Sequence, residues 1–229
     1  MAIVYTLTQT DQELQQILEL QRANLRDQLS FQELQSQGFV TLRHDLETLR
    51  LMHQEYPHVI AKYGDADAGN DKDRRVIGYA LCMMKSSEKL IPTFAGVFQI
   101  IESVSYQGKI LTNVPLSSCQ RQQQKSHHEH QSKKVTTEST SPYFHYFVMG
   151  QVCVDKEFRG QGVVTKLYQH LRDTMAPHFQ GTVTAISPRN PRSLRAHAKV
   201  GFQSLHDFTS KGEEWKLVIL DWSNDSKDR

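Results

Sequence analysis

The feature that most constrains this 229-residue sequence lies between Gln151 and Val164. An apolar stretch there has the character of a strand and ends in the turn Arg159-Gly-Gln-Gly162. Hydrophobic residues then recur at helical spacing, so a helix begins close to Gly162. A strand that passes through a glycine turn into an amphipathic helix favours an α/β fold. The apolar face of this predicted helix consists of Val163, Val164, Leu167, Leu171 and Met175.

A helix that begins directly after glycines is suited to binding phosphate. Its first N–H groups lack partners within the helix, and the helix dipole places partial positive charge there. Arg159 would add a fixed charge beside them. The alternative is that Gly160 and Gly162 only permit the backbone angles of a tight turn. Neither the G-x-x-x-x-G-K-[ST] loop nor the six-residue dinucleotide glycine pattern occurs in the sequence.

A second motif follows at residues 182–202. A strand over 182–186 leads to Asn190, which can cap a helix that Pro191 begins and Gly201 ends. The complete order from residue 143 is strand, loop, helix, strand, helix and strand, with the last strand near 215–222. This order predicts a mixed α/β arrangement.

Together the two motifs resemble the GNAT superfamily of CoA-dependent acyltransferases. The family's loop has the form V-x-P-x-[YF]-R-x-x-G-x-G/A, and this sequence departs from it at Lys156 and Val164. The likeness is best over 143–222, and residues 1–90 match the preceding strand, helices and hairpin in order only. It implies an α/β (α+β) fold in one domain over 1–229, with a mixed, mostly antiparallel twisted sheet, flanking helices and splayed central strands. The matching positions are Val154, Phe158, Arg159, Gly160, Gln161, Gly162 and Val163.

The resemblance implies acetyl-CoA as co-substrate and an amine as acceptor. Backbone groups of Val152 and Val154 would hold the pantetheine arm and the thioester carbonyl, in a slot between 151–154 and 182–186. The residues that match cofactor-binding positions of the family are Val152, Cys153, Val154, Arg159, Gly160, Gln161, Gly162, Val163, Val164, Asn190 and Ser193.

Catalytic candidates also follow from the resemblance. His197 stands where the family has the Tyr of Tyr-x-x-x-Gly-Phe, so it is a candidate general acid, although a polar residue on a helix surface is an equal interpretation. Candidates for the base are Glu102, His145 and Gln151, of which Gln151 can only orient a water molecule. Cys153 lies between two valines, which favours core packing over an acyl-enzyme route. We therefore expect direct attack of the amine within a ternary complex.

The composition and charge of the sequence limit the classes of partner that we expect. The net charge of +2 gives no field that would indicate nucleic acid or an anionic membrane. The first residues lack the pattern of a secretory signal, and no apolar run approaches the length of a membrane span, which predicts a soluble cytoplasmic protein. Three widely spaced cysteines predict reduced thiols. The basic residues Arg189, Arg192, Arg195 and Lys199 suit either solvation or the 3′-phosphate of CoA.

Residues 117–141 carry almost no core-forming side chains, so we expect a mobile insertion. His127, His128 and His130 lie within it, but we predict no metal site because no partner cluster has ligand spacing. Val164 and His197 keep open a second function, a catalytically silent acyl-CoA-binding regulatory module. The sequence specifies neither the acceptor nor the oligomeric state.

Overall fold

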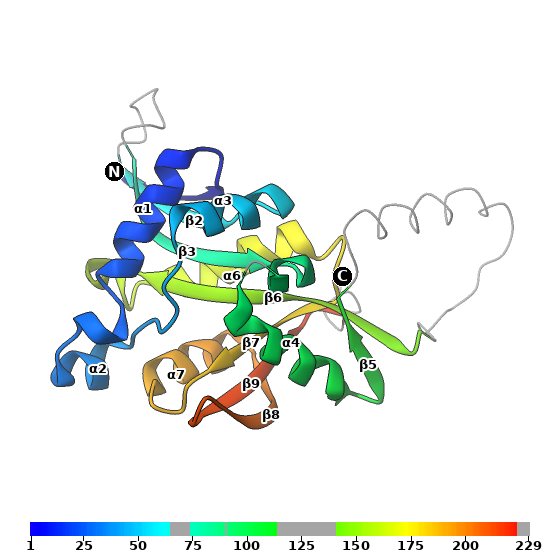
Figure 1. The fold of residues 1–229 in the computed structure, drawn as a ribbon. Coiled ribbons are helices and arrows are strands. Elements are labelled where there is room, and N and C mark those ends of the chain that lie inside the picture. The colour runs from blue at the N-terminus through cyan, green and yellow to red at the C-terminus, as the bar shows by residue number, and fades with distance from the viewer. Residues whose placement is uncertain (65–73, 90, 114–140, 224–229) are drawn as a thin grey trace, which may run out of the picture.

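The computed structural model describes residues 1–64, 74–89, 91–113 and 141–223. In this part of the chain one twisted, mostly antiparallel sheet has the order β1-β2-β3-β6-β7-β9-β8, and β5 pairs with both β4 and β6 (Figure 1). Two of the pairings, β5 with β6 and β6 with β7, are parallel. The strands are β1 (Ala2–Leu7), β2 (Val59–Gly64), β3 (Arg75–Met83), β4 (Ser105–Tyr106), β5 (Lys109–Thr112), β6 (Tyr143–Val154), β7 (Gly181–Ile186), β8 (Gln203–Ser210) and β9 (Glu213–Asp221).

The helices begin and end where the sequence supplies caps. Thr10 and Ser30 each form a capping box with a glutamate three residues later, and Asn190 accepts a hydrogen bond from the backbone of Ser193. Gly201 ends the last helix in a left-handed conformation. The α-helices are α1 (Asp11–Arg22), α2 (Phe31–Gln37), α3 (Leu46–Glu55), α4 (Pro92–Ser103), α6 (Val163–Met175) and α7 (Pro191–Val200), and the 3₁₀ turns are η1 (Arg26–Gln28), η3 (Lys85–Lys89) and η4 (Lys156–Phe158).

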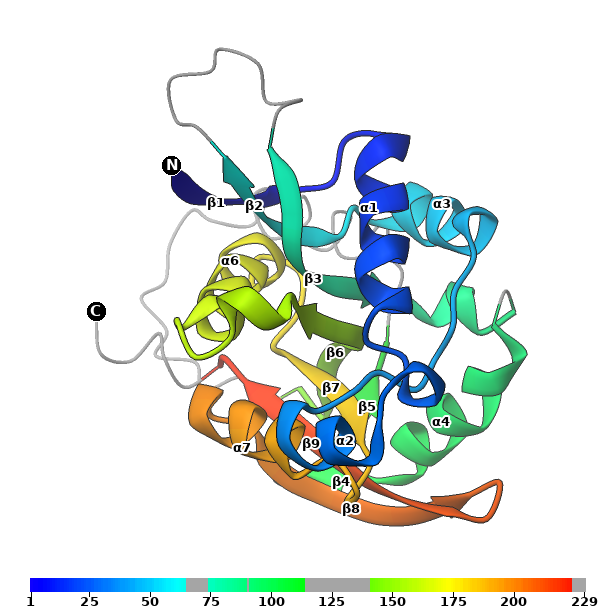
Figure 2. The same cartoon turned by 90° about the vertical axis from the view of Figure 1, so that its left-hand side faces the viewer.

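Helices cover both faces of the sheet. Figure 2 shows α1, α3 and α4 on one side of the strands and α6 and α7 on the other. Each face has its own hydrophobic core: Ile17, Leu49 and Phe98 are fully buried on the first, and Leu167 and Leu171 on the second. The burial of these large side chains is the main stabilising contribution to the fold. Within the described ranges no helix has the length and apolarity to cross a membrane.

The two central strands separate part of the way along their length. The parallel ladder between β6 and β7 ends at Val148 and Val183, although β6 continues to Val154 and β7 to Ile186. On its other side β6 remains paired with β3, with a register shift that leaves Gly150 as an extra residue. The splayed strands predicted from the sequence are therefore present, and they open the sheet beside the glycine loop.

Most predicted helices and strands are confirmed, and the structure contains several further strands that were not predicted. The apolar stretch after Ile91 forms α4. The hairpin of β4 and β5 and the strand β8 were not anticipated, because their polar residues alternate only weakly with apolar ones. The predicted insertion at 117–141 lies, apart from Ser141, outside the described residues, as does Cys119.

Candidate functional site

Two adjoining cavities open at the splay of β6 and β7. Cavity 1, of about 340 Å³, lies among β6, β7, α4 and the hairpin of β8 and β9. Cavity 2, of about 390 Å³, lies between the glycine loop, the start of α6 and α7. The cavities share a wall, so one slot runs past the separated strands from the glycine loop toward α4. The residues that line both are Phe39, Val40, Val152, Asn190, Ser193 and His197.

The glycine loop forms one end of the slot. Gly160 and Gly162 have φ angles of 79° and 78°, which an L side chain rarely adopts. A Cβ atom at either position would meet no atom within 4 Å, so the backbone faces open space. Gly162 caps α6, whose first N–H groups are therefore available at cavity 2. The local geometry is that of an anion site at a helix N-terminus.

The wall of cavity 2 is positively charged. Arg159, Arg192, Arg195 and Lys199 line it, and none of its described lining residues is acidic. Val164, the residue that departs from the family pattern, also lines this cavity and packs partly against the adjacent core. The wall thus combines apolar surface with the opposite charge to a phosphate group.

The guanidinium of Arg159 is engaged by the protein itself. It donates through Nε to the carbonyl of Val154 at 2.9 Å, through Nη1 to the carbonyl and side chain of Gln37 at 2.9 and 3.1 Å, and through Nη2 to Asn24. Burial lowers its pKa, yet an arginine remains charged. The sequence placed this charge beside a pyrophosphate, whereas the structure uses most of its donors to hold neighbouring backbone.

Residues 36–40, the strap, run across the junction of the two cavities. Three side chains from the second half of the chain fix it: Arg192 donates to the carbonyl of Ser36 at 3.0 Å, Arg159 to that of Gln37 and Asn190 to that of Phe39 at 2.8 Å. The first two carbonyls lie at the C-terminal end of α2, where helical partners are missing. Figure 2 shows α2 beside α7, consistent with this fastening.

Gln151 lies at the wall of cavity 1, and the protein itself engages both polar atoms of its side chain. Its Oε1 accepts from the Tyr79 hydroxyl at 2.6 Å and from Gln21 at 3.1 Å, and its Nε2 donates to the carbonyl of Leu42 at 2.9 Å. This buried network ties α1 and the chain after the strap to β6. Orienting a water molecule, the role considered for Gln151, would fall to the second hydrogen of Nε2, since Oε1 already accepts two hydrogen bonds.

His197 is buried, with 3% of its surface exposed, and its ring contacts the aromatic rings of Tyr168 and Phe202, which also contact each other. Its Nδ1 lies 2.8 Å from the carbonyl oxygen of Ser193, which can only accept, so Nδ1 carries the proton. Nε2 then accepts from the Tyr168 hydroxyl at 2.9 Å. Burial lowers the pKa of His197 to about 4, so the neutral ring predominates at pH 7.

Glu102 and His145 lie away from the slot. Glu102 forms an ion pair with Lys85, and neither Glu102 nor His145 lines either cavity. Cys153 lines cavity 2, and burial raises the pKa of its thiol to about 12, which disfavours a thiolate nucleophile. Cys153 and Cys82 are both free thiols.

The predicted cofactor residues converge on cavity 2 with one exception. Gln161 does not line the cavity, and its side chain donates back to the carbonyl of Glu157 at 2.9 Å. The structure brings the others together, whereas of the predicted catalytic residues only His197 and Gln151 reach the slot. The predicted cofactor residues on the wall of cavity 2 are Val152, Cys153, Val154, Arg159, Gly160, Gly162, Val163, Val164, Asn190 and Ser193.

Sequence reasoning missed the strap and the hairpin residues of cavity 1. Phe39 and Val40 come from a short segment outside the named helices and strands. Trp215 and Glu213 line cavity 1 from the start of β9. No local pattern identifies such residues. A hydrophobic stretch next to Gly38 was the one available signal.

Comparison with known proteins agrees with this geometry. The model of the acetyltransferase (GNAT) family matches residues 135–202, which include β6, the glycine loop, α6, β7 and α7. No curated protein gives a significant sequence match. The matched segment thus contains the glycine loop and much of the wall of cavity 2.

Solved structures share the fold over nearly the whole chain. The NatC complex bound to Gag peptide and CoA matches with a TM-score of 0.55 and 14% identity, over 96% of this chain and 99% of that one. NAA60 of Arabidopsis thaliana in complex with acetyl-CoA gives 0.55 and 10%, over 96% and 99%. The ribosomal-protein-S18-alanine N-acetyltransferase of Escherichia coli gives 0.51 and 8%, over 97% and 95%. The family model therefore matches the part of the chain that forms the slot, and the solved structures share its fold.

Proposed function

We propose that the protein transfers an acetyl group from acetyl-CoA to an amine by direct attack in a ternary complex. The observation that carries this proposal is the continuous slot at the splay of β6 and β7. One end offers a helix N-terminus and a cationic wall, which suits the phosphates of CoA. The other end is mainly apolar and leaves room for an acyl group and an acceptor. Complexes of fold neighbours with CoA or acetyl-CoA support the choice of co-substrate.

In this proposal the pantetheine arm lies along the unpaired side of β6 near Val152 and Val154. The amine nitrogen attacks the thioester carbonyl carbon, the N–C bond forms, and the C–S bond breaks as the CoA sulfur leaves with its electron pair. Backbone N–H groups of β6 that face β7 beyond Val148, where the ladder between these two strands has ended, would stabilise the oxyanion. The attacking nitrogen loses one proton, and the departing thiolate can take one up.

General-acid catalysis at the leaving group contributes little, because a thiol has a pKa near 8.5 and its thiolate therefore leaves without prior protonation. His197 therefore enters the proposal as a neutral residue that holds Ser193 and the α7 wall in place, and its sequence-based role as general acid is tested below. Glu102 has no part, since its ion pair with Lys85 lies outside both cavities.

A substitution at Gly162 tests the phosphate end of the slot. Aspartate and asparagine both tolerate the left-handed conformation that Gly162 adopts, and a Cβ there meets open space. Gly162→Asp places a negative charge at the helix N-terminus, whereas Gly162→Asn has nearly the same shape without the charge. We expect acetyl-CoA affinity, measured by calorimetry, to fall at least about tenfold more in the aspartate variant. Equal affinities would remove the anion site from the proposal.

The second candidate is a CoA-binding module without turnover. It is favoured by the lack of an available general base among the described lining residues other than Glu213, since the amide of Gln151 cannot take up a proton and the Nε2 atom of His197 already accepts from Tyr168. Release of free thiol from acetyl-CoA in the presence of an amine panel separates the two candidates. Binding without thiol release on any amine would favour the regulatory module.

A further inference from the structure

Charge is segregated along the slot. Cavity 2 is lined by the four cations described above, and cavity 1 contains Lys211 and Glu213. Glu213 is the sole carboxylate among the described residues that line either cavity. Phosphates are therefore attracted to one end, and an ammonium group finds a counter-charge at the other.

Glu213 begins β9 at the mouth of cavity 1 and already holds a cation. Its Oε1 accepts from Arg26 Nη1 at 2.8 Å, and Arg189 Nη1 lies 4.0 Å away. The side chains of Arg26 and Glu213 are each 35% exposed, so water reaches the pair and its net contribution is small. A ligand cation can therefore compete for this carboxylate at low cost.

Apolar side chains form much of the remaining wall of cavity 1, together with polar ones such as Thr41, Thr184 and Ser210. Val97 and Ile101 face it from α4, and Phe208 and Trp215 from the hairpin strands. The Arg26 guanidinium also lies 5.6 Å from the centre of the Phe39 ring, so the ion pair borders the junction of the two cavities. A ligand that fits cavity 1 has one cationic group and an apolar body.

We propose that Glu213 recognises the ammonium group of the acceptor, and that the acceptor is a primary amine carried on an apolar skeleton. Arg26 pairs with the Glu213 carboxylate until the amine takes the place of its guanidinium. This inference rests on the proposed function, in which cavity 1 is the acceptor side. Glu213 acts in recognition and specificity, and the bound ammonium still releases its proton before it attacks.

The test uses phenethylamine as the probe, because its ring suits the apolar wall and its amine is charged at pH 7. Its uncharged analogue of similar shape is 2-phenylethanol. Calorimetry measures the dissociation constant of each with the CoA-saturated protein and with the protein alone. Loss of CoA binding then counts against the proposed function, and loss of the preference for the amine counts separately against Glu213.

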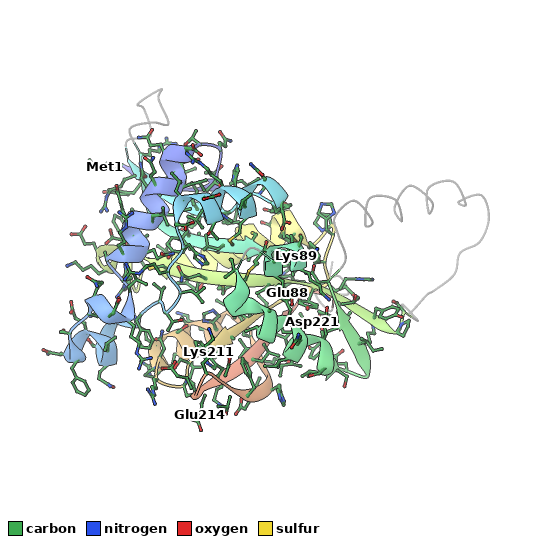
Figure 3. All side chains as sticks on the ribbon, viewed as in Figure 1. Met1, Glu88, Lys89, Lys211, Glu214 and Asp221 are labelled. Atoms are coloured by element: carbon green, nitrogen blue, oxygen red, sulfur yellow. The ribbon has the colours of Figure 1, made fainter. Side chains whose placement is uncertain are left out.

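Three variants define the outcome. Glu213→Gln should weaken phenethylamine binding about tenfold and leave 2-phenylethanol unchanged, since a charge-assisted hydrogen bond is lost. Arg26→Gln should tighten phenethylamine binding about threefold, because the competing cation is gone. Glu214→Gln is the matched control: Glu214 is exposed, lies outside both cavities and extends from the same hairpin (Figure 3).

The two substitutions are expected to change phenethylamine binding in opposite directions, and this difference decides the test. If the Arg26 and Glu213 pair served only to fasten the hairpin, both substitutions would change amine binding in the same direction. Weakening in both variants, or equal binding of the amine and the alcohol by the wild type, would overturn the inference.

Discussion

At the scale of single residues, the hydrogen bonds of His197 decide what the residue can do. The sequence made His197 a candidate general acid, because it stands where the resemblance places a Tyr and because imidazole titrates near neutral pH. The structure buries the ring and fixes its tautomer, with Nδ1 donating to Ser193 and Nε2 accepting from Tyr168. A neutral imidazole has no readily transferable proton, so burial rather than position in the sequence governs its chemistry.

We therefore expect His197→Gln to lower kcat less than tenfold, well below the ~10²-fold or larger loss typical of a general acid. The wild-type kcat should show no inflection from this residue between pH 6 and 8, because its pKa is about 4. Steady-state kinetics with acetyl-CoA measure both. Tyr168→Phe is the control, since it removes the same hydrogen bond without removing the ring. A hundredfold fall confined to the His197 variant would restore the general acid.

At the scale of elements, side chains from the second half of the chain hold the strap in place. The short helix α2 buries none of its residues fully, so its position depends on the donors that Arg159, Asn190 and Arg192 provide to its C-terminal end and the strap. Arginine suits this task because its planar fork reaches several carbonyl groups at once. The motif residue Arg159 thus shapes the slot through the strap.

Arg159→Lys should lower the free energy of unfolding by about 2 kcal/mol, because one ammonium cannot replace the contacts to Val154, Gln37 and Asn24. Urea denaturation measures this loss. Hydrogen exchange of the Val40 amide, which donates to the Asn24 carbonyl, should quicken in the same variant. Arg195→Lys, at an exposed position on the same cavity, should stay within about 0.5 kcal/mol of the wild type. Equal losses in both variants would contradict the strap's dependence on Arg159.

At the scale of the whole molecule, buried histidines couple stability to pH. Burial lowers the pKa of His44 and His197 to about 4 and that of His58 to about 3, from an ordinary value of 6.5. The unfolded chain therefore binds more protons than the folded protein below pH 6.5. The stability present above pH 6.5 is lost as the pH falls toward these folded-state values.

Between pH 6.5 and 5 we expect the free energy of unfolding to fall by up to about 1.4 kcal/mol per pH unit for each of these histidines. Urea denaturation at several pH values measures the slope. His44→Leu should reduce the slope, since it removes one buried titrating ring whose Nε2 has no hydrogen-bond partner among the described residues. His206→Asn, at an exposed site, is the control. A slope unaffected by His44→Leu would show that other groups control acid unfolding.

The sequence by itself determined most of the elements and located the glycine loop at one end of the slot. Capping boxes, helical periodicity and glycine turns act between residues a few positions apart, so Thr10, Ser30, Asn190 and Gly201 could be located without a fold. The residues predicted to bind the cofactor are mostly contiguous for the same reason. Only the tertiary structure decided that Arg159 holds the strap, that His197 is buried and neutral, and that Glu213 and Phe39 meet at one slot. These properties depend on burial and on contacts between residues more than 100 positions apart, and no local pattern encodes either.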